Sequence, residues 1–227
     1  MKLYHYRKAI MFQHHGQPVS VSAEEILFAL GRVPNTASLE LDNAGVGTER
    51  GRIVANEFMQ TSAPHIYTAG DCTGLHDILH LAVQQGEIAA HNIAHPNAPR
   101  RMDDRLLLKV IFTDPQVACV GLTERTAMTR GVPYLSARHP FSDHGKSLIM
   151  EAGDGYVKLL ADPRSGEILG GACVGPVGGE LIQEIVVALA KRMTVHELAA
   201  LPHYHPTLAE IWTYPAEALA ARIPSPR

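Results

Sequence analysis

Residues 156–174 read YVKLLADPRSGEILGGACV, and this stretch decides the fold. Two runs rich in strand-forming residues, 156–161 and 168–174, lie on either side of residues 162–166 (DPRSG), where a proline and a glycine occupy positions that a tight turn favours. The pattern predicts a β-hairpin. A third run of the same kind over residues 134–139 precedes it, so we expect an antiparallel meander.

Helices are expected after the hairpin. Hydrophobic residues recur at intervals of three or four positions over residues 181–193, which predicts a helix. Thr194 with Glu197, and Thr207 with Glu210, have the T-x-x-E spacing of a capping box, so two further helices are expected to start there. Strands followed by helices are typical of an α+β layer.

Two more strands are expected to begin this layer. They cover residues 106–113 and 116–122, and Asp114-Pro115 separates them. A helix then starts at Thr123-Glu124, and Gly131 is placed to end it.

The first 99 residues are less regular. Residues 8–30 predict two strands around a turn at residues 15–18, followed by a strand signal within residues 51–71 and a helix over residues 78–93. The prolines and charged residues within 96–105 form the best candidate for a domain boundary.

The composition restricts the class of function. The chain has 227 residues, of which 46% are hydrophobic and 19% charged, as in an ordinary globular protein. Its net charge of -3 provides no positive field for a phosphate backbone, so we expect no nucleic-acid partner. The longest apolar run of the C-terminal half, residues 185–190, is far short of the ~20 residues that span a bilayer, so we expect no membrane partner. The start of the chain lacks the apolar region of a secretory signal, which makes a cytoplasmic location the default expectation.

Cysteines and histidines give no strong metal signal. Cys72, Cys119 and Cys173 are isolated and odd in number, which suits a reducing compartment, and no CxxC or CxxxxC pair is present. The 13 histidines are scattered, and the groups at 14–15 and 203–205 are weak zinc candidates because a tetrahedral site needs three or four converging ligands. We expect no metal.

Three stretches in fixed order carry a family resemblance. Residues 29–35 (ALGRVPN), 61–71 (TSAPHIYTAGD) and 205–210 (HPTLAE) resemble the late motifs of the flavin-dependent pyridine nucleotide-disulfide oxidoreductases. Residues 113–124 (TDPQVACVGLTE) are similar to the opening of that family's dimerisation domain. The resemblance extends over most of the chain, from residue 24 to about residue 220.

The resemblance also implies a division of the chain. The family's glycine-rich fingerprints and its CxxxxC pair lie upstream of these motifs and are absent from this sequence. The chain therefore resembles the C-terminal half of such an enzyme: residues 1–30 as the tail of the nicotinamide-binding domain, 31–99 as the C-terminal part of the FAD-binding domain, and 103–222 as the dimerisation domain. The implied fold class is α+β, an antiparallel sheet with helices preceded by partial remnants of α/β domains. Such a fragment is expected to be inactive by itself.

The resemblance implies contacts with FAD. Asp71 would accept a hydrogen bond from a ribityl hydroxyl, with Gly70 allowing close approach, whereas the residues alone also allow a loop or Asx-turn role for Asp71. The helix that follows would direct its N–H groups and positive dipole end at the flavin. Its start would line the cofactor with Asp77, Ile78, Leu79 and His80. For His80, a solvated position in the first turn is equally open.

Other residues of this region have two readings each. In the family, the glycine at Gly31 lets a dinucleotide approach the backbone, but a hinge glycine at a domain crossover would look the same. Arg32 is interpreted as an interdomain ion-pair or capping residue, and Cys72 as a small buried residue, because a single thiol cannot cycle as a dithiol. The residues that choose between NAD and NADP lie upstream of the sequence, so the second cofactor is NAD or NADP.

His205 and Glu210 form the candidate catalytic pair. In the family's lipoamide- and glutathione-reducing members this histidine exchanges a proton with the dithiol, and the glutamate holds the imidazole. Such chemistry needs a base beside the sulfur, because the thiolate is the reactive form. From the residues alone, His205 is a turn histidine before a proline and Glu210 the third helical residue of a capping box. His203 is interpreted as a surface neighbour.

The resemblance implies a homodimer in which His205 acts on the disulfide of the other protomer. The substrate would be a disulfide or dithiol small molecule or a lipoyl group. Residues 205–210 are nearer to dihydrolipoamide dehydrogenases than to glutathione reductases, and mercuric reductases carry Tyr at His205, but residues 211–215 (IWTYP) leave the disulfide open. The alternative function is a non-enzymatic dimerisation or assembly module formed by residues 103–220.

Overall fold

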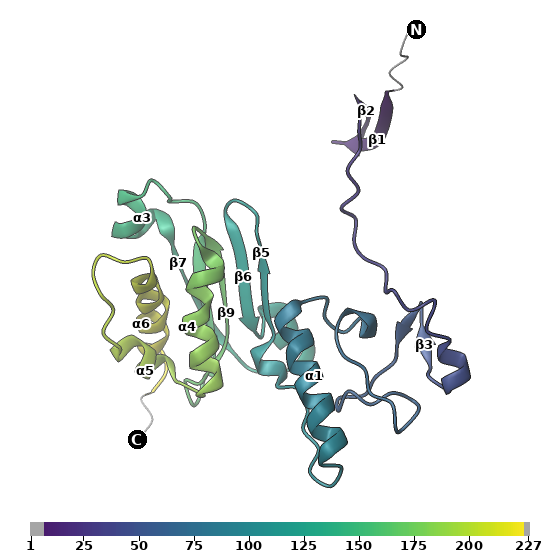
Figure 1. Ribbon diagram of the computed structural model, residues 1–227. Helices are drawn as coiled ribbons and strands as arrows, with labels where there is room; N and C mark the ends of the chain where they lie inside the picture. The colour runs from purple at the N-terminus through teal and green to yellow at the C-terminus, as the bar shows by residue number, and fades with distance from the viewer. Residues whose placement is uncertain (1–6, 225–227) are drawn as a thin grey trace.

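The computed structural model describes residues 7–224. Figure 1 shows a hairpin near the N-terminus, an extended segment that joins it to a middle part containing helix α1, and a C-terminal part in which helices lie against a sheet. No helix within this described range is both long and apolar enough to cross a bilayer. The combination of antiparallel sheets and helices makes the fold α+β.

The C-terminal part is built on a five-stranded antiparallel sheet with the order β5-β6-β9-β8-β7. The expected meander is confirmed because β7 pairs with β8 and β8 pairs with β9. Strands β5 and β6 form a second hairpin, and β6 pairs with β9. The Asp162 carboxylate closes the β8–β9 turn by accepting hydrogen bonds from the N–H groups of Arg164 and Ser165, both at 2.8 Å. The strands are β5 (Leu108–Ile111), β6 (Gln116–Gly121), β7 (Leu135–Pro140), β8 (Tyr156–Ala161) and β9 (Ile168–Gly175).

Helices α4 and α6 cover one face of this sheet: α4 packs on β6 and β9, and α6 on β7 and β8 (Figure 1). Gly171 of β9 allows α4 to approach, since a Cβ there would lie 2.8 Å from Ile185 Cγ2. The helices of this part are α2 (Glu124–Arg130), α3 (Gly145–Ile149), α4 (Gly178–Ala190), α5 (Val195–Ala200), the 3-10 helix η5 (Ala209–Trp212) and α6 (Thr213–Ala220).

The core of the C-terminal part lies between the sheet and these helices. Trp212 is fully buried in it, and the Trp212 indole Nε1 donates a hydrogen bond to the Leu181 carbonyl of α4 at 3.0 Å. Buried aliphatic side chains of α4, such as Ile182 and Ile185, share this core with Val157 of β8. This hydrogen bond fixes the segment that carries η5 and α6 to α4.

Of the helix starts predicted at Thr123, Thr194 and Thr207, the first two are confirmed. The Thr123 side chain caps α2, which Gly131 ends in the left-handed conformation. Thr194 caps α5, and Glu197 returns a hydrogen bond to the Thr194 N–H at 2.7 Å. The helix start at Thr207 is wrong: η5 begins at Ala209 without a side-chain cap, because the Glu210 carboxylate is bound elsewhere.

Helix α4 was expected to reach residue 193 but ends at Ala190, and α3 was not predicted. Met193 nevertheless packs against the core from outside the helix. In α3, only Ser147 is buried, so its five residues carry no hydrophobic period that a sequence pattern could detect.

The middle part contains α1 (Leu79–Ala94), which confirms the predicted helix, and the short strands β3 (Thr48–Glu49) and β4 (Arg52–Ile53). The strand expected within residues 51–71 is largely wrong, since beyond β4 this stretch forms turns and isolated bridges. The cause is local: the Asn56 side chain accepts hydrogen bonds from the N–H groups of Phe58 and Gln60, both at 3.0 Å, and folds the chain back on itself.

The N-terminal hairpin consists of β1 (Lys8–His14) and β2 (Gln17–Ala23). Its turn is His15-Gly16, shorter than the expected turn over residues 15–18, because Gln17 and Pro18 belong to β2. The strand-like run at residues 26–28 forms no strand. Leu27 is 93% exposed, and within residues 7–224 no partner strand takes up the hydrogen bonds of this run.

Candidate functional site

His205 and Glu210 meet in the segment between α5 and α6. His205 Nδ1 lies 3.1 Å from Glu210 Oε1 and 3.0 Å from Glu210 Oε2. The His205 side chain is 77% exposed, whereas the Glu210 side chain is 10% exposed. The imidazole therefore has one nitrogen on a nearly buried carboxylate. Within residues 7–224 its other nitrogen, Nε2, makes no protein hydrogen bond and is open to a reacting group.

Glu210 owes its position to the core. It lies on η5 directly before Ile211 and Trp212, both fully buried, and the Thr213 hydroxyl donates a hydrogen bond to the Glu210 carbonyl at 2.8 Å. This anchoring directs the carboxylate toward His205. The capping-box interpretation of Glu210 is thus wrong, since its side chain accepts from an imidazole and not from the Thr207 backbone.

A second histidine lies behind the carboxylate. His144, at the start of α3, is fully buried, and His144 Nε2 is 3.4 Å from Glu210 Oε1. Burial lowers the pKa of His144 below its ordinary value, and the charge of Glu210 opposes this shift. The sequence provided no signal for this residue, because only the folded structure brings His144 next to Glu210, 66 positions along the chain.

Aromatic rings enclose this histidine. The His144 and Tyr214 rings meet edge to face at 6.1 Å, and Tyr214 stacks almost parallel on His139 at 4.0 Å. Phe141 approaches His144 from another side at 6.5 Å. The inner side of the Glu210 carboxylate is therefore shielded from water, while its outer side carries the exposed imidazole of His205.

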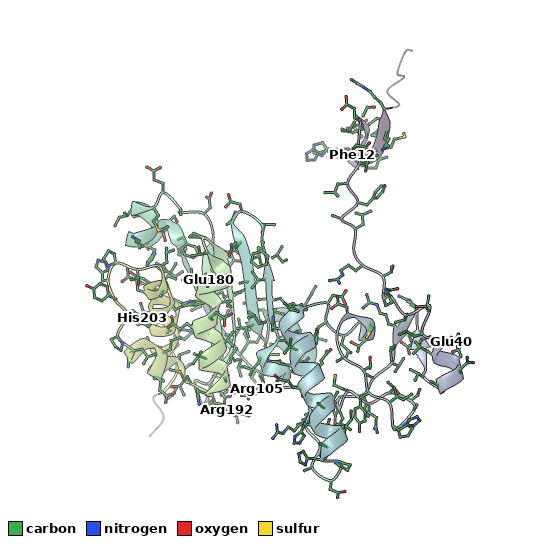
Figure 2. All side chains as sticks on the ribbon, viewed as in Figure 1. Phe12, Glu40, Arg105, Glu180, Arg192 and His203 are labelled. Atoms are coloured by element: carbon green, nitrogen blue, oxygen red, sulfur yellow. The ribbon has the colours of Figure 1, made fainter. Side chains whose placement is uncertain are left out.

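His203 makes a separate pair. Its Nε2 lies 2.7 Å from Glu184 Oε1 of α4, and its Nδ1 lies 3.1 Å from the Leu201 carbonyl. Figure 2 shows His203 beside α4. Both ring nitrogens thus have partners away from Glu210, so His203 and His205 do not form one site.

Two of the predicted cofactor residues, Asp71 and Asp77, line a cavity of about 250 Å³ in the middle part. Asp71 opens the 3-10 helix η2 (Asp71–Thr73), and its Oδ2 pairs with Arg32 Nη2 at 2.7 Å. The Asp77 carboxylate, on the same cavity, pairs with Arg52 at 3.4 Å. Arg32 thus forms an ion pair, although within residues 31–99 and not between domains as the sequence suggested, and the strand expected to lead into Asp71 is absent.

The other predicted cofactor residues do not line this cavity. Ile78 precedes α1 and is half-buried, whereas Leu79 is 82% exposed and His80 is exposed. Gly31 has φ of 121° in the extended segment, and a Cβ there would meet no neighbouring atom. The cavity is lined by Arg32, Val33, Pro34, Asn35, Arg52, Asp71, Cys72 and Asp77.

Gln85 is a residue of this region that sequence reasoning missed. Its side chain is fully buried, and its Oε1 accepts a hydrogen bond from the Gly70 N–H at 2.6 Å, which fixes the backbone immediately before Asp71. Its position along the helix could have revealed it, because Gln85 lies one helical turn from both Leu81 and Ala89 on the buried face of α1. A polar residue on an apolar face needs a buried partner.

A larger cavity of about 780 Å³ lies between residues 55–59, 75–76 and 101–105. Arg105 and Arg192 both line it and lie near each other in Figure 2. It contains none of the predicted site residues. In residues 7–224 no group of three or more His, Cys, Asp or Glu side chains is arranged to hold a metal ion.

The cysteines are free thiols. Burial raises the pKa of the Cys119 thiol, and it raises the pKa of the fully buried Cys173 thiol to about 12. Cys72 is half-buried beside Thr68, and its Sγ donates to the Ala69 carbonyl at 3.2 Å. Cys72 is thus packed but only half-buried, whereas the sequence suggested a buried residue.

Cys173 is expected to resist iodoacetamide at pH 8 in the folded chain and to react once the chain is unfolded, because the thiolate is the nucleophile. The raised pKa of the folded Cys173 thiol also predicts that the free energy of unfolding falls at high pH. The contribution of this thiol is complete below its unfolded pKa, near 9, and is lost as pH rises toward 12, by about 1.4 kcal/mol per pH unit. Mass spectrometry of labelled peptides checks the reaction. Equal labelling rates in the folded and unfolded chain would contradict the burial.

Two family models match the chain. The model described as "Pyridine nucleotide-disulphide oxidoreductase" matches residues 7–86, and the model described as "Pyridine nucleotide-disulphide oxidoreductase, dimerisation domain" matches residues 108–216. The first match contains Asp71 and Asp77, and the second contains His205 and Glu210. Together the matches cover most of the sequence.

Curated relatives and solved structures agree with these models. A dihydrolipoyl dehydrogenase of Mycobacterium tuberculosis is 39% identical over 196 residues, which are 86% of this chain and 42% of that protein. A dihydrolipoyl dehydrogenase of Thermus scotoductus is 39% identical over 90% of this chain and 44% of its own length. The crystal structure of LpdA from M. tuberculosis has a TM-score of 0.81 and 28% identity, and the match covers 94% of this chain and 48% of that one. The chain thus spans less than half the length of each protein.

Proposed function

Because this chain belongs to the pyridine nucleotide-disulphide oxidoreductases, we propose that it is the C-terminal portion of an FAD-dependent NAD(P)H:disulfide oxidoreductase of the dihydrolipoamide dehydrogenase type. On this proposal the chain supplies a flavin-contacting aspartate, the surface for a homodimer and a proton-transfer pair. The proposed units are residues 1–30, 31–99 and 103–222 as divided above. Its three isolated cysteines support a cytoplasmic location for the enzyme.

The observation that carries the proposal is the contact between His205 and Glu210. With Nδ1 held 3.0 Å from a carboxylate, His205 Nε2 accepts a proton from a substrate thiol, and the carboxylate stabilises the imidazolium that forms. The deprotonated sulfur is then the nucleophile in thiol–disulfide exchange. The same imidazole returns the proton when a thiolate leaves. His205 and Glu210 are therefore the proposed catalytic residues.

The exposure of His205 supports a site completed by a second protomer. The His205 imidazole is 77% exposed, so few groups of its own chain surround it. Acid–base catalysis on sulfur requires the base to lie beside the reacting atom. A two-fold dimer built through the matched dimerisation domain would bring the disulfide of one protomer to the His205 of the other. A disulfide, a dithiol or a lipoyl group is the proposed substrate.

The residues around the smaller cavity fit part of a flavin. Asp71 is 31% exposed there, and a carboxylate accepts hydrogen bonds from the hydroxyl groups of a ribityl chain. A volume of about 250 Å³ admits only a portion of FAD, so the proposed contact is partial. Gly70 and the start of α1, from Asp77 through Ile78 and Leu79 to His80, are the proposed flanking contacts, with Gly31 near the NAD or NADP.

Bound at this position, the flavin would carry electrons between the pyridine nucleotide and the disulfide. This chain would contribute residues that hold the flavin. Gln85 fixes the Gly70 backbone, and Arg32 holds the Asp71 carboxylate at the cavity.

The proposed function is tested by co-expressing the chain with the segment of the M. tuberculosis dihydrolipoyl dehydrogenase that it does not cover, a pair of polypeptides called here the complemented enzyme. Retained FAD, a dimer and lipoamide reduction by NADH or NADPH are expected. A colourless dimer without turnover would instead favour the assembly module formed by residues 103–220.

Asp71→Ala is expected to weaken FAD binding by the complemented enzyme by roughly 10- to 150-fold, because a hydrogen bond to a charged group contributes about 1.5–3 kcal/mol. Flavin absorbance after dilution and filtration measures the retained cofactor. Asp42→Ala removes an exposed carboxylate in the same part of the chain and serves as the matched control. Equal FAD retention by both variants would rule out the proposed contact of Asp71.

A further inference from the structure

Glu210 is in contact with two imidazoles and not with one. His205 lies on its exposed side at 3.0 Å, and His144 Nε2 lies on its buried side at 3.4 Å. His144 Nε2 is buried without a hydrogen bond of normal geometry, and Glu210 Oε1 is the acceptor it approaches. Hydrogen bonds at catalytic sites are often long in unliganded structures and shorten when the reacting groups assemble.

The contact made by the other ring nitrogen of His144, Nδ1, determines which of the two nitrogens carries the proton. His144 Nδ1 lies 2.7 Å from the hydroxyl of Ser147, which is also buried. If the Ser147 hydroxyl donates to Nδ1, the ring proton is on Nε2 and points to the Glu210 carboxylate. The opposite tautomer would place the Nε2 lone pair against that carboxylate in a buried setting, which is unfavourable for both acceptors.

The surroundings of His144 favour its neutral form. The titratable groups that face it are Glu210 of η5, His205 of the preceding loop, His139 of β7 and Tyr214 of α6. Only Glu210 favours the charged form, and burial outweighs it, so the pKa of His144 is lowered. A neutral ring with its proton on Nε2 is a hydrogen-bond donor to Glu210 that adds no charge.

We propose that His144 is a positioning residue that acts through Glu210: as the neutral Nε2–H tautomer, fixed by Ser147, it holds the carboxylate from behind and limits how strongly that carboxylate favours the imidazolium form of His205. A donor on one side of a carboxylate stabilises its ionised form and disperses its negative charge. Less of that charge then acts on His205. This inference rests on the proposed role of the pair but does not require turnover for its test.

A purely structural role makes different predictions. His144 immediately precedes α3, and Ser147 is the third residue of that helix, so their contact alone would stabilise the helix start. In that case the protonation of His205 would not depend on the side chain at position 144. The ring titration of His205 therefore separates the two roles, whereas a change in thermal stability would not.

The test uses the full chain with isotope-labelled histidines and follows the ring nitrogens by NMR as a function of pH. In the unsubstituted chain, the His144 ring is expected to carry its neutral proton on Nε2; a proton on Nδ1 would overturn the proposal without any variant. In His144→Leu, the titration of His205 is expected to move to higher pH by about half a unit or more, because Glu210 loses its second donor.

His144→Gln is the matched variant, because its amide nitrogen reaches as far as Nε2 and can donate to Glu210. It is expected to restore the original titration of His205. An unchanged titration in His144→Leu, or the same shift in His144→Gln, would overturn the proposal. Should His144→Leu fail to fold, Ser147→Ala replaces it: loss of the tautomer preference with a smaller shift of the His205 titration is expected, and no change in either would overturn it. An inactive complemented enzyme with the expected titrations would contradict only the proposed function.

Discussion

His205→Gln is expected to lower the lipoamide turnover of the complemented enzyme by about 10²- to 10⁴-fold, the range that general acid–base catalysis contributes. Glutamine cannot accept a proton at neutral pH, so the substrate thiol would lose the base that generates its thiolate. The retained FAD is expected to stay unchanged, because the pair lies in a different part of the chain from the Asp71 cavity. Steady-state kinetics and flavin absorbance on the same preparation measure both quantities.

His203→Gln is the matched control for this experiment. It makes the same chemical change two positions away, at an imidazole whose partner is Glu184 of α4 and not Glu210. Its turnover is expected to stay close to that of the unsubstituted protein. If both variants lose activity equally, the loss comes from disruption of the loop, and if neither does, His205 is not the base.

Trp212→Ala is expected to destabilise the chain by about 3–5 kcal/mol, the range for truncating a buried aromatic residue. The indole is fully buried, and its removal also leaves the Leu181 carbonyl without its 3.0 Å hydrogen bond. Equilibrium unfolding in urea, followed by circular dichroism, measures the free energy of unfolding. Because Trp212 lies two positions after Glu210, the carboxylate is also expected to lose its fixed position beside His205.

Trp212→Phe separates these contributions. It keeps most of the buried ring but removes the N–H donor, so a smaller loss of about 1–3 kcal/mol is expected from the unpaired carbonyl. Tyr204→Ala truncates an aromatic ring that is 84% exposed and is expected to leave the free energy of unfolding nearly unchanged. A Trp212→Ala variant as stable as Tyr204→Ala would contradict the packing of η5 into the core.

The sequence predicted the fold best where local and tertiary preferences agree. In the β8–β9 hairpin, the turn residues 162–166 and the flanking strands all favour the same structure, and the hairpin is confirmed. The failures have identifiable causes. Residues 26–28 have strand-forming side chains but no partner strand within residues 7–224, and residues 56–60 are bent by the Asn56 side chain.

The same distinction applies to the candidate site. His205 and Glu210 are five positions apart, so a motif could bring them to attention, and the structure places their side chains in contact. The T-x-x-E pattern at Thr207 was misleading because the helix starts at Ala209, which makes Glu210 its second residue, and the Glu210 carboxylate contacts an imidazole and not the Thr207 backbone. His144 could not be predicted, since its approach to Glu210 depends on the packing of α3, which no sequence pattern revealed.

The hydrogen bond from the Trp212 indole to the Leu181 carbonyl has an evolutionary consequence. It ties α4 to the short helix η5 that carries Glu210, although α4 itself contributes no group to the proposed proton transfer. Sequence change in α4 is therefore expected to be constrained by the position of Glu210 as well as by the packing of the core.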